Sequence, residues 1–193
     1  DGVADLGIVG SNVLEERGIN VKRLLPLDFG YCSLSIAVPE ASSYTSVQEL
    51  DGKKIATSYP QILAKYMKKQ NIKTEIIFLK GCVEIAPALK VADGICDLVS
   101  TGSTLRTNRL RTIDTVMKSQ AVLIGTENAK PKKRSAAEKL VLRVQAVQDA
   151  RAYKYIMFNL PRVALEKVTK LVPGCKSPTV VPLADSDFVA VHS

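Results

Sequence analysis

Residues 46–60 read SVQELDGKKIATSYP and contain, in order, the signals for a helical turn, a strand and a second helix. Ser46 stands three residues before Glu49, which is the spacing of a capping box. Gly52 then predicts a turn, and the strand KIATS follows it. Pro60 is a residue type favoured at the first position of a helix, and apolar residues recur behind it every three or four positions. A strand that leads into a helix is a typical building unit of α/β domains.

The rest of the first 100 residues repeats this alternation. Strands are predicted at residues 4–10, 24–29, 32–38, 54–58, 75–79 and 95–99, and helices at 11–18, 60–67 and 83–91. Strands and helices at this spacing predict an α/β domain with a largely parallel sheet.

The pattern changes beyond Asn128, where the basic run KPKKR is followed by one long predicted helix. After it we expect a strand at 155–161, an amphipathic helix at 163–171 that Pro173 and Gly174 end, and two strands at 179–184 and 187–193. The order βαββ is that of the front part of a ferredoxin-like module.

The composition is that of a globular chain with about one or two domains. Of 193 residues, 46% are hydrophobic and 24% are charged, which is too apolar for a disordered chain. No stretch approaches the ~20 consecutive apolar residues of a membrane span, so we expect no membrane partner. The first residues, DGVADLGIVG, lack the basic start and apolar run of a signal peptide. Four separated cysteines and the single His192 favour neither a zinc site nor a disulfide framework, so we expect a reduced, cytoplasmic protein.

The formal net charge of +8 favours a polyanionic partner. Nucleic acid, acidic lipid and phosphorylated metabolites all meet this condition. The basic cluster of Lys130, Lys132, Lys133 and Arg134 has no aromatic residues between its cations that could stack on bases. We therefore interpret it as the solvated start of a helix, and we expect no nucleic-acid partner.

Residues 91–110, VADGICDLVSTGSTLRTNRL, combine a strand, a hydroxyl-rich loop and a possible helix start. The hydroxyl loop consists of Ser100, Thr101, Gly102, Ser103 and Thr104. Successive backbone N–H groups and hydroxyls at a helix N-terminus form a concave anion site that fits a phosphate. The alternative is a capping loop that binds only water, and the composition of the loop taken alone favours it. The Walker A lysine pattern is absent, which argues against a P-loop nucleotidase.

Two carboxylates precede this loop in the sequence. Asp97 lies three residues before it, and a carboxylate beside a phosphate is repelled unless a cation or sugar hydroxyls lie between them. Asp97 therefore suits a ribose diol or Mg²⁺, or else it caps the loop by accepting backbone N–H groups. Glu84 lies early in a predicted helix, where the helix dipole stabilises a carboxylate without any catalytic role. For Glu84, a role at the site and this structural role both stay open.

Five segments together carry a resemblance to a known family. They are DGVADLGIVGSNVLEE (1–16), LDFGYCSLSIAVP (27–39), DGKKIATSYP (51–60), GCVEIAPAL (81–89) and VADGICDLVSTGSTLRTN (91–108). In this order and spacing they resemble ATP phosphoribosyltransferase, the first enzyme of histidine biosynthesis, and the resemblance runs from residue 1 to about residue 126. The tail from Ala150 to Ser193 resembles the opening of the C-terminal regulatory domain of the family's long form.

The resemblance implies a two-lobe α/β catalytic core of the periplasmic-binding-protein type (type II), with the active site in the cleft between the lobes. The chain would cross between the lobes twice. Residues 1–30 and 116–149 would form lobe I, residues 31–115 would form lobe II, and residues 150–193 would form a ferredoxin-like βαββ regulatory module.

The resemblance also implies a reaction. N1 of the adenine ring of ATP attacks C1 of 5-phosphoribosyl diphosphate (PRPP) with inversion, and pyrophosphate leaves. A neutral ring nitrogen needs no deprotonation, so no residue is expected to act as a general acid or base. Mg²⁺, held through the substrate phosphates, and basic side chains would stabilise the departing pyrophosphate.

The site residues follow from the same resemblance. The hydroxyl loop would hold the 5-phosphate of PRPP, and Asp97 would lie near the ribose hydroxyls. Glu84 would lie near the ribose or the metal, and Tyr59 would border the cleft.

For the long form, the resemblance implies feedback inhibition by histidine and assembly into homo-oligomers, both dimers and hexamers. Asn159, Ser177 and Thr179 are the polar positions that we expect near the histidine site, with hydrogen bonding at turns and strand ends as the alternative role. The family carries a strand ahead of ADLGIVG and a closing helix and strand after His192. We therefore expect this chain to be incomplete at both ends.

A solute-binding protein of the same two-lobe architecture, without catalysis, is the alternative function, because SVQELDGKKIATS followed by a helix also occurs in such binders. The missing signal peptide, the STGST sequence and the βαββ tail favour the enzyme. A nucleic-acid-binding protein is a third possibility, which an aromatic content of 5% and the lack of a recognised motif disfavour.

Overall fold

The structure is a computed structural model that describes residues 4–126, 130–152, 154–172 and 177–193. The contacts divide the chain into two units, residues 1–141 and 142–193, and each unit is described by itself. Within the described ranges, no helix combines the length and the apolar composition that crossing a membrane requires.

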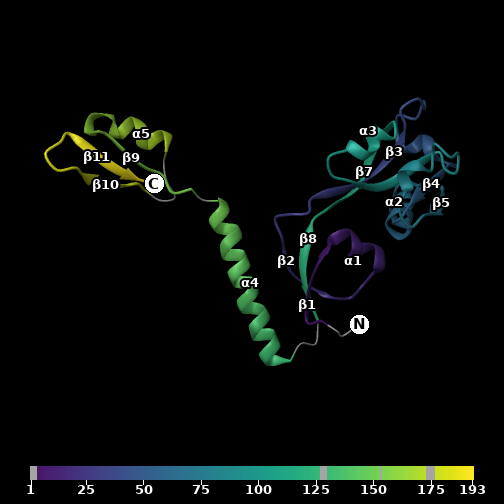
Figure 1. The fold of residues 1–193 in the computed structure, drawn as a ribbon, viewed down its shortest axis with the longest axis horizontal. Coiled ribbons are helices and arrows are strands. Elements are labelled where there is room, and N and C mark those ends of the chain that lie inside the picture. The colour runs from purple at the N-terminus through teal and green to yellow at the C-terminus, as the bar shows by residue number, and fades with distance from the viewer. Residues whose placement is uncertain (1–3, 127–129, 153, 173–176) are drawn as a thin grey trace. The chain divides into compact units, whose positions relative to one another are not determined.

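The first unit contains a five-stranded sheet in the order β5-β4-β6-β3-β7 (Figure 1). Its strands are β3 (Cys32–Pro39), β4 (Lys54–Thr57), β5 (Glu75–Phe78), β6 (Gly94–Val99) and β7 (Leu110–Ser119). β4 is parallel to β5 and β6, whereas β3 is antiparallel to β6 and β7. The prediction of a largely parallel sheet is therefore wrong. The sheet is mixed because β3, through which the chain enters it, runs against both of its neighbours. β3 pairs on one side with β7, through which the chain leaves the sheet, and Cys32 lies opposite Ser119.

The helices of this part are η1 (Val47–Leu50), α2 (Pro60–Gln70), η2 (Val83–Ile85) and α3 (Ser103–Thr107). The predicted capping box is confirmed, because the Glu49 carboxylate accepts the Ser46 N–H at 3.0 Å. The predicted helix at 83–91 is wrong: it stops after one 3₁₀ turn. Pro87 has no N–H to donate to the Val83 carbonyl, and the Ala86 N–H takes that acceptor instead.

The apolar core of this sheet comes mainly from β3, β4 and α2. Leu34, Ile36 and Val38 of β3 pack with Ile55 and Leu63, and all five side chains are fully buried. This packing accounts for the apolar periodicity of residues 60–67, since α2 turns its apolar face toward the sheet.

A second, smaller sheet of the first unit has the order β1-β8-β2 and is antiparallel throughout. Its strands are β1 (Leu6–Gly10), β2 (Lys22–Pro26) and β8 (Ala121–Gly125), and α1 (Ser11–Arg17) joins the first two. α1 ends before Gly18, the last residue of the helix predicted at 11–18, and Gly18 has φ +57°, the left-handed conformation common at a helix C-terminus. The chain passes between the two sheets twice, from β2 to β3 and from β7 to β8.

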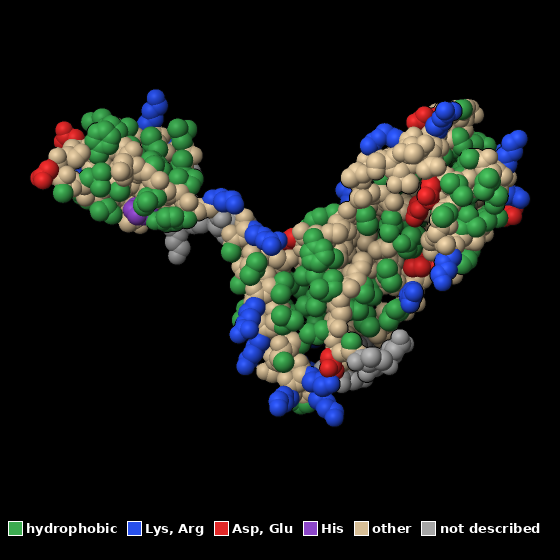
Figure 2. Space-filling view, in the orientation of Figure 1, with side chains coloured by type: hydrophobic (Ala, Val, Ile, Leu, Met, Phe, Trp, Pro, Cys, Tyr) green, Lys and Arg blue, Asp and Glu red, His purple; other side chains and the backbone are tan. Residues whose placement is uncertain are grey.

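Hydrophobic side chains (green in Figure 2) are visible where Figure 1 draws β1, β2 and β8. Ile8, Phe29 and Tyr31 are exposed residues of this region. Lys and Arg (blue) stand in separate groups on the visible face.

The long helix predicted after the basic run is α4 (Pro131–Ala152), and its residues belong to both units. Lys132, Lys133 and Arg134 lie in its first turn, and Lys133 forms an ion pair with Asp5 at 2.8 Å. The cluster thus opens a helix, as the sequence predicts.

The second unit has the predicted βαββ order. Its elements are β9 (Met157–Pro161), η3 (Arg162–Ala164), α5 (Leu165–Leu171), β10 (Thr179–Pro182) and β11 (Phe188–His192). The sheet order is β10-β11-β9, and all pairings are antiparallel. Leu160, Val189 and Val191 form a small core with Leu165 and Val168 of α5. The predicted stop at Pro173 and Gly174 lies outside the described residues.

Candidate active site

The hydroxyl loop connects the end of β6 to the start of α3. Gly102 has φ +73°, a left-handed conformation that only glycine adopts without strain, and α3 begins at the next residue. Ser100 and Thr101 are exposed, and the Thr101 and Ser103 hydroxyl oxygens lie 3.1 Å apart. The first amides of a helix have no acceptor within the helix, so this loop combines hydroxyls with free N–H donors as the prediction of an anion site requires.

Helix α3 has one buried anchor and a capped C-terminal end. Leu105 is buried among the apolar residues around β6, and the Asn108 side chain donates a hydrogen bond to the Thr104 carbonyl at 2.9 Å. Arg106 donates to the Thr101 carbonyl at 3.4 Å, so a guanidinium group lies beside the loop. The loop therefore has a fixed base and a neighbouring positive charge.

A cleft of about 690 Å³ lies next to the loop. Val99 and Ser100 line it from the end of β6, Cys32 from the start of β3, Ser11 from α1 and Lys118 from β7. Its walls thus come from both sheets of the first unit, and a lysine is among them. A cleft with this lining suits an anionic ligand of moderate size.

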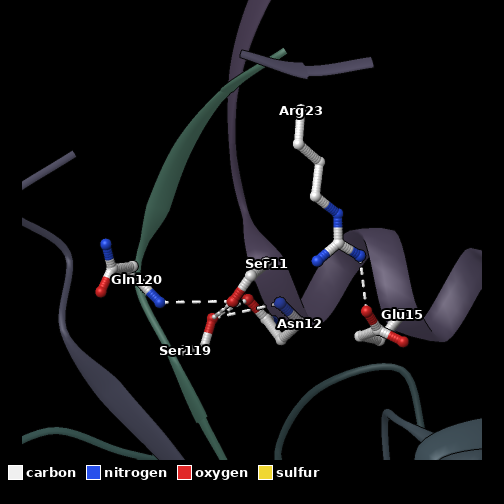
Figure 3. A network of polar contacts seen from close by, with 6 residues as sticks. All are labelled: Ser11, Asn12, Glu15, Arg23, Ser119 and Gln120. Carbon is white, nitrogen blue, oxygen red and sulfur yellow. Dashed lines mark hydrogen bonds and ion pairs between the residues drawn. The ribbon is translucent and has the colours of Figure 1, made fainter. Parts of the chain in front are cut away.

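A polar network crosses from α1 to the passage between β7 and β8 (Figure 3). Asn12, which is only 4% exposed, donates its N–H to the Ser119 hydroxyl at 3.1 Å, and that hydroxyl donates to the Asn12 side chain at 2.8 Å. Ser11 donates to the same hydroxyl at 3.0 Å and accepts a longer bond from the Gln120 N–H. At Gly10, a Cβ would lie 2.3 Å from the Asn12 side-chain oxygen, so the network needs a glycine there.

Sequence reasoning missed this network. The signal that could have found it is Asn12, two residues after the Gly10 that ends a strand, since a polar residue buried at such a position needs a partner. Nothing in the sequence around Ser119 marks it as that partner.

Asp97 lies close enough to Glu84 for the Glu84 charge to act on it, and close enough to Tyr59 to act on Tyr59. Burial raises the pKa of Asp97, and the Glu84 charge raises it further, while the Leu98 N–H that Asp97 accepts at 2.8 Å lowers it. Burial also raises the pKa of Tyr59, and the Asp97 charge adds to this effect. Leu98 lies within β6 and not in the hydroxyl loop, so this hydrogen bond is not the loop cap that the sequence left open for Asp97.

The carboxylates of Glu84 and Asp97 suit a magnesium ion whose remaining ligands are substrate phosphates and water. Within the described ranges, no group of three or more His, Cys, Asp or Glu residues could cage a metal ion. Glu84 and Asp97 offer oxygen ligands, and their mutual repulsion would be relieved by a cation. Mg²⁺ is commonly bound by one or two carboxylates together with substrate phosphates and water.

The three polar positions expected near the histidine site lie in the second unit. Asn159 is paired with Ala190, and Thr179 is paired with His192, on either side of β11. Because Ala190 and His192 are two residues apart, all four side chains lie on one face of the sheet, opposite the face that carries the buried Val189 and Val191. Ser177 is exposed two residues before Thr179.

Comparison with known proteins gives the family. The family model described as ATP phosphoribosyltransferase matches residues 1–146, and the model described as HisG, C-terminal domain, matches residues 150–193. The ATP phosphoribosyltransferase of Cytophaga hutchinsonii is 46% identical over 193 residues, which are 100% of this chain and 68% of that protein. The chain belongs to the ATP phosphoribosyltransferase family.

The ATP phosphoribosyltransferase family catalyses the first step of histidine biosynthesis, so the function predicted from the sequence is confirmed. The solved ATP phosphoribosyl transferase complex from Thermotoga maritima has a TM-score of 0.67 at 28% identity and covers 77% of this chain and 72% of that chain. A periplasmic sulfonate-binding protein from Methylobacillus flagellatus KT has a TM-score of 0.54 at 19% identity and covers 74% and 49%. The likeness to the binding protein is one of fold alone, and it confirms the predicted fold class.

Proposed function

We propose that the cleft beside the hydroxyl loop binds PRPP and ATP, and that residues 100–104 hold the 5-phosphate of PRPP. The observation that carries the proposal is the loop itself, where Gly102 at φ +73° brings hydroxyls and free amides together at the start of α3. Arg106 beside the loop and Lys118 in the cleft lining add the positive charge that a phosphorylated substrate needs.

Catalysis then consists of positioning two substrates. Because the 5-phosphate is anchored at one end of the cleft, C1 of the ribose is restricted to a small region where N1 of adenine can attack it. Tyr59 would border this space, and Asp97 would receive the ribose hydroxyls.

Glu84 and Asp97 would hold Mg²⁺ together with the substrate phosphates. When bound, the ion would neutralise part of the negative charge that develops on the departing pyrophosphate. The nucleophile is a neutral ring nitrogen, so neither carboxylate has to remove a proton from it.

We also propose the domain organisation that the sequence implies. Lobe I would comprise residues 1–30 and 116–149, and lobe II residues 31–115. In support, the small sheet is built from β1, β2 and β8, which lie in the first set, and four strands of the large sheet lie within the second. β7 (Leu110–Ser119) would carry the chain across the boundary at 115/116.

Residues 150–193 would be the regulatory module, with Asn159, Ser177 and Thr179 near bound histidine. The match of these residues to the family's C-terminal domain and the shared face of Asn159 and Thr179 support this role. Exposed Met157 and Val181 on the same face offer apolar area for assembly into dimers and hexamers.

The free thiols of Cys32, Cys82 and Cys96 suit a reducing, cytoplasmic setting, and Cys175 lies outside the described residues.

The test of the loop is a calorimetric titration with PRPP in the presence of Mg²⁺. Thr104→Val removes a hydroxyl at nearly constant volume, and we expect PRPP affinity to fall about tenfold, because hydrogen bonds to charged groups contribute about 1.5–3 kcal/mol. Gly102→Val should act in the same direction, since a β-branched residue is strained at positive φ. Thr112→Val, at an exposed threonine of β7, is the matched control. An unchanged PRPP affinity in Thr104→Val and Gly102→Val would count against the assignment.

A further inference from the structure

Helix α2 begins without a cap from its own segment. Its N-cap residue is Tyr59, whose side chain makes no capping hydrogen bond, and Pro60 at the first position has no N–H. The amides of Gln61 and Ile62 are therefore the first-turn donors that require an acceptor from elsewhere. A Ser, Thr, Asp or Asn at position 59 would be the usual local solution.

Glu16 of α1, the helix beside the small sheet, supplies that acceptor. The Gln61 N–H donates to its Oε1 and the Ile62 N–H donates to its Oε2, both at 3.0 Å. One carboxylate thus satisfies two amides that lie 45 and 46 residues away along the chain. Hydrogen bonds from helix N-terminal amides to a charged acceptor are stronger than neutral ones, and the helix dipole adds to them.

The two helices belong to different sheets. α1 joins β1 to β2 of the small sheet, whereas α2 joins β4 to β5 of the large one. Because the cleft is lined from both sheets, a contact between α1 and α2 influences how far apart its walls stand.

The contact also lies next to the candidate site. Tyr59 immediately precedes the capped turn, and the side chain of Asn12, one helical turn before Glu16 on α1, interacts with it. Asn12 is in turn joined to Ser119. α1 is therefore fastened through Asn12 to the passage between β7 and β8, and through Glu16 to the start of α2.

We propose that Glu16 is a positioning residue for phosphoribosyl transfer, which holds the start of α2, and with it Tyr59, against α1 in the arrangement that binds PRPP and ATP. This role rests on the proposed function of the cleft. Glu16 acts through the backbone of α2 and needs no contact with either substrate.

Glu15 provides a matched control. It is the neighbouring residue of the same helix and carries the same charge, but it pairs with Arg23 within the small-sheet part (Figure 3). Glu15→Gln therefore removes one negative charge from α1 and leaves the contact with α2 in place.

The experiment compares Glu16→Ala, Glu16→Gln and Glu15→Gln with the unchanged full chain. The first readout is the exchange rate of the Gln61 and Ile62 amides, measured by NMR without substrates. The second is the dependence of initial rates on PRPP and on ATP, with Mg²⁺ present. We expect Glu16→Ala to speed exchange of the two amides and to raise KM for both substrates roughly fivefold, with a smaller change in kcat, which is the size expected from the loss of a helix cap.

Glu16→Gln keeps the volume and one acceptor oxygen, so it should fold and show a weaker form of the same effects, while Glu15→Gln should match the unchanged chain. Faster exchange with unchanged KM in Glu16→Ala would mean that Glu16 only caps α2 and does not affect substrate binding. Unchanged exchange in Glu16→Ala would show that the contact does not form in solution. Either result overturns the proposal. The exchange measurement needs no substrate, so it tests the contact separately from the loop, whose own test is Thr104→Val.

Discussion

The carboxyl group of Asp97 is harder to ionise in the folded chain than in the unfolded one. Its carboxyl is partly buried, and both burial and the charge of Glu84 raise its pKa. A carboxyl whose pKa is higher in the folded state binds its proton more tightly there, so folding is favoured below the unfolded pKa of about 4 and this contribution is lost as pH rises through the folded pKa. Such an arrangement is typical of a site rather than of a structural core.

Replacing Asp97 by Asn should therefore raise the melting temperature at pH 7, because no charge is then desolvated. The gain should shrink as pH falls through the folded pKa and be small below about 4, where the carboxyl of the unchanged chain is protonated in both states. Thermal unfolding at pH 7 and pH 3.5, followed by circular dichroism, measures both values, and a PRPP titration should show weaker binding at the same time. A stability gain of equal size at both pH values would contradict the assigned cause.

At the scale of elements, Thr57 connects two strands and the start of a helix. Its side chain is fully buried, and its hydroxyl donates to the Cys96 carbonyl of β6 at 2.6 Å while it accepts the Tyr59 N–H at 2.9 Å. Thr74, just before β5, offers a contrast: its hydroxyl oxygen is buried and has no hydrogen-bond partner in the part of the chain that the structure describes.

Thr57→Val should lower the free energy of unfolding by about 2 kcal/mol, because it leaves a buried carbonyl and an N–H without partners. Thr74→Val should be neutral or stabilise by up to about 1 kcal/mol, because it removes a buried polar atom that gains nothing from burial. Urea denaturation of both variants measures the difference. Equal losses in the two would show that hydrogen bonding does not distinguish the sites.

The elements that local patterns describe were predictable, and those that depend on long-range pairing were not. The capping box at Ser46 and the stop at Gly18 were found because each is decided within a few residues. β7 was missed because its pairing with β3 shifts register at two points, leaving Ile113 and Val116 without opposite residues. Such bulges break the period-two alternation by which a strand is recognised.

At the scale of the whole molecule, the two units share no sheet and no core among the residues that the structure describes, since two sheets lie in the first and one in the second. The second unit is closed around Leu160, Val189 and Val191, none of which belongs to the cores of the first. Matches to two separate family models, over residues 1–146 and 150–193, follow nearly the same division.

We therefore expect that deletion of residues 150–193 abolishes inhibition by histidine and leaves turnover in place. Initial rates with ATP, PRPP and Mg²⁺, at increasing histidine concentration, compare the shortened and the full chain. The deletion also removes the last residues of α4, so the substitution Asn159→Ala in the full chain is a second, smaller change. It should weaken inhibition by histidine and leave α4 intact. Inhibition that persists in the shortened chain would exclude the regulatory role.

The sequence by itself determined the type of most elements, the hydroxyl loop and the family, because these depend on residues that are neighbours along the chain or on segments that can be recognised one by one. Only the tertiary structure decided the direction of β3 in the mixed sheet, the pairing of Asn12 with Ser119 and the capping of α2 by Glu16. Each of these is a set of hydrogen bonds between segments far apart in the sequence. Their partners are chosen by which strands lie side by side after folding, and no local pattern carries that information.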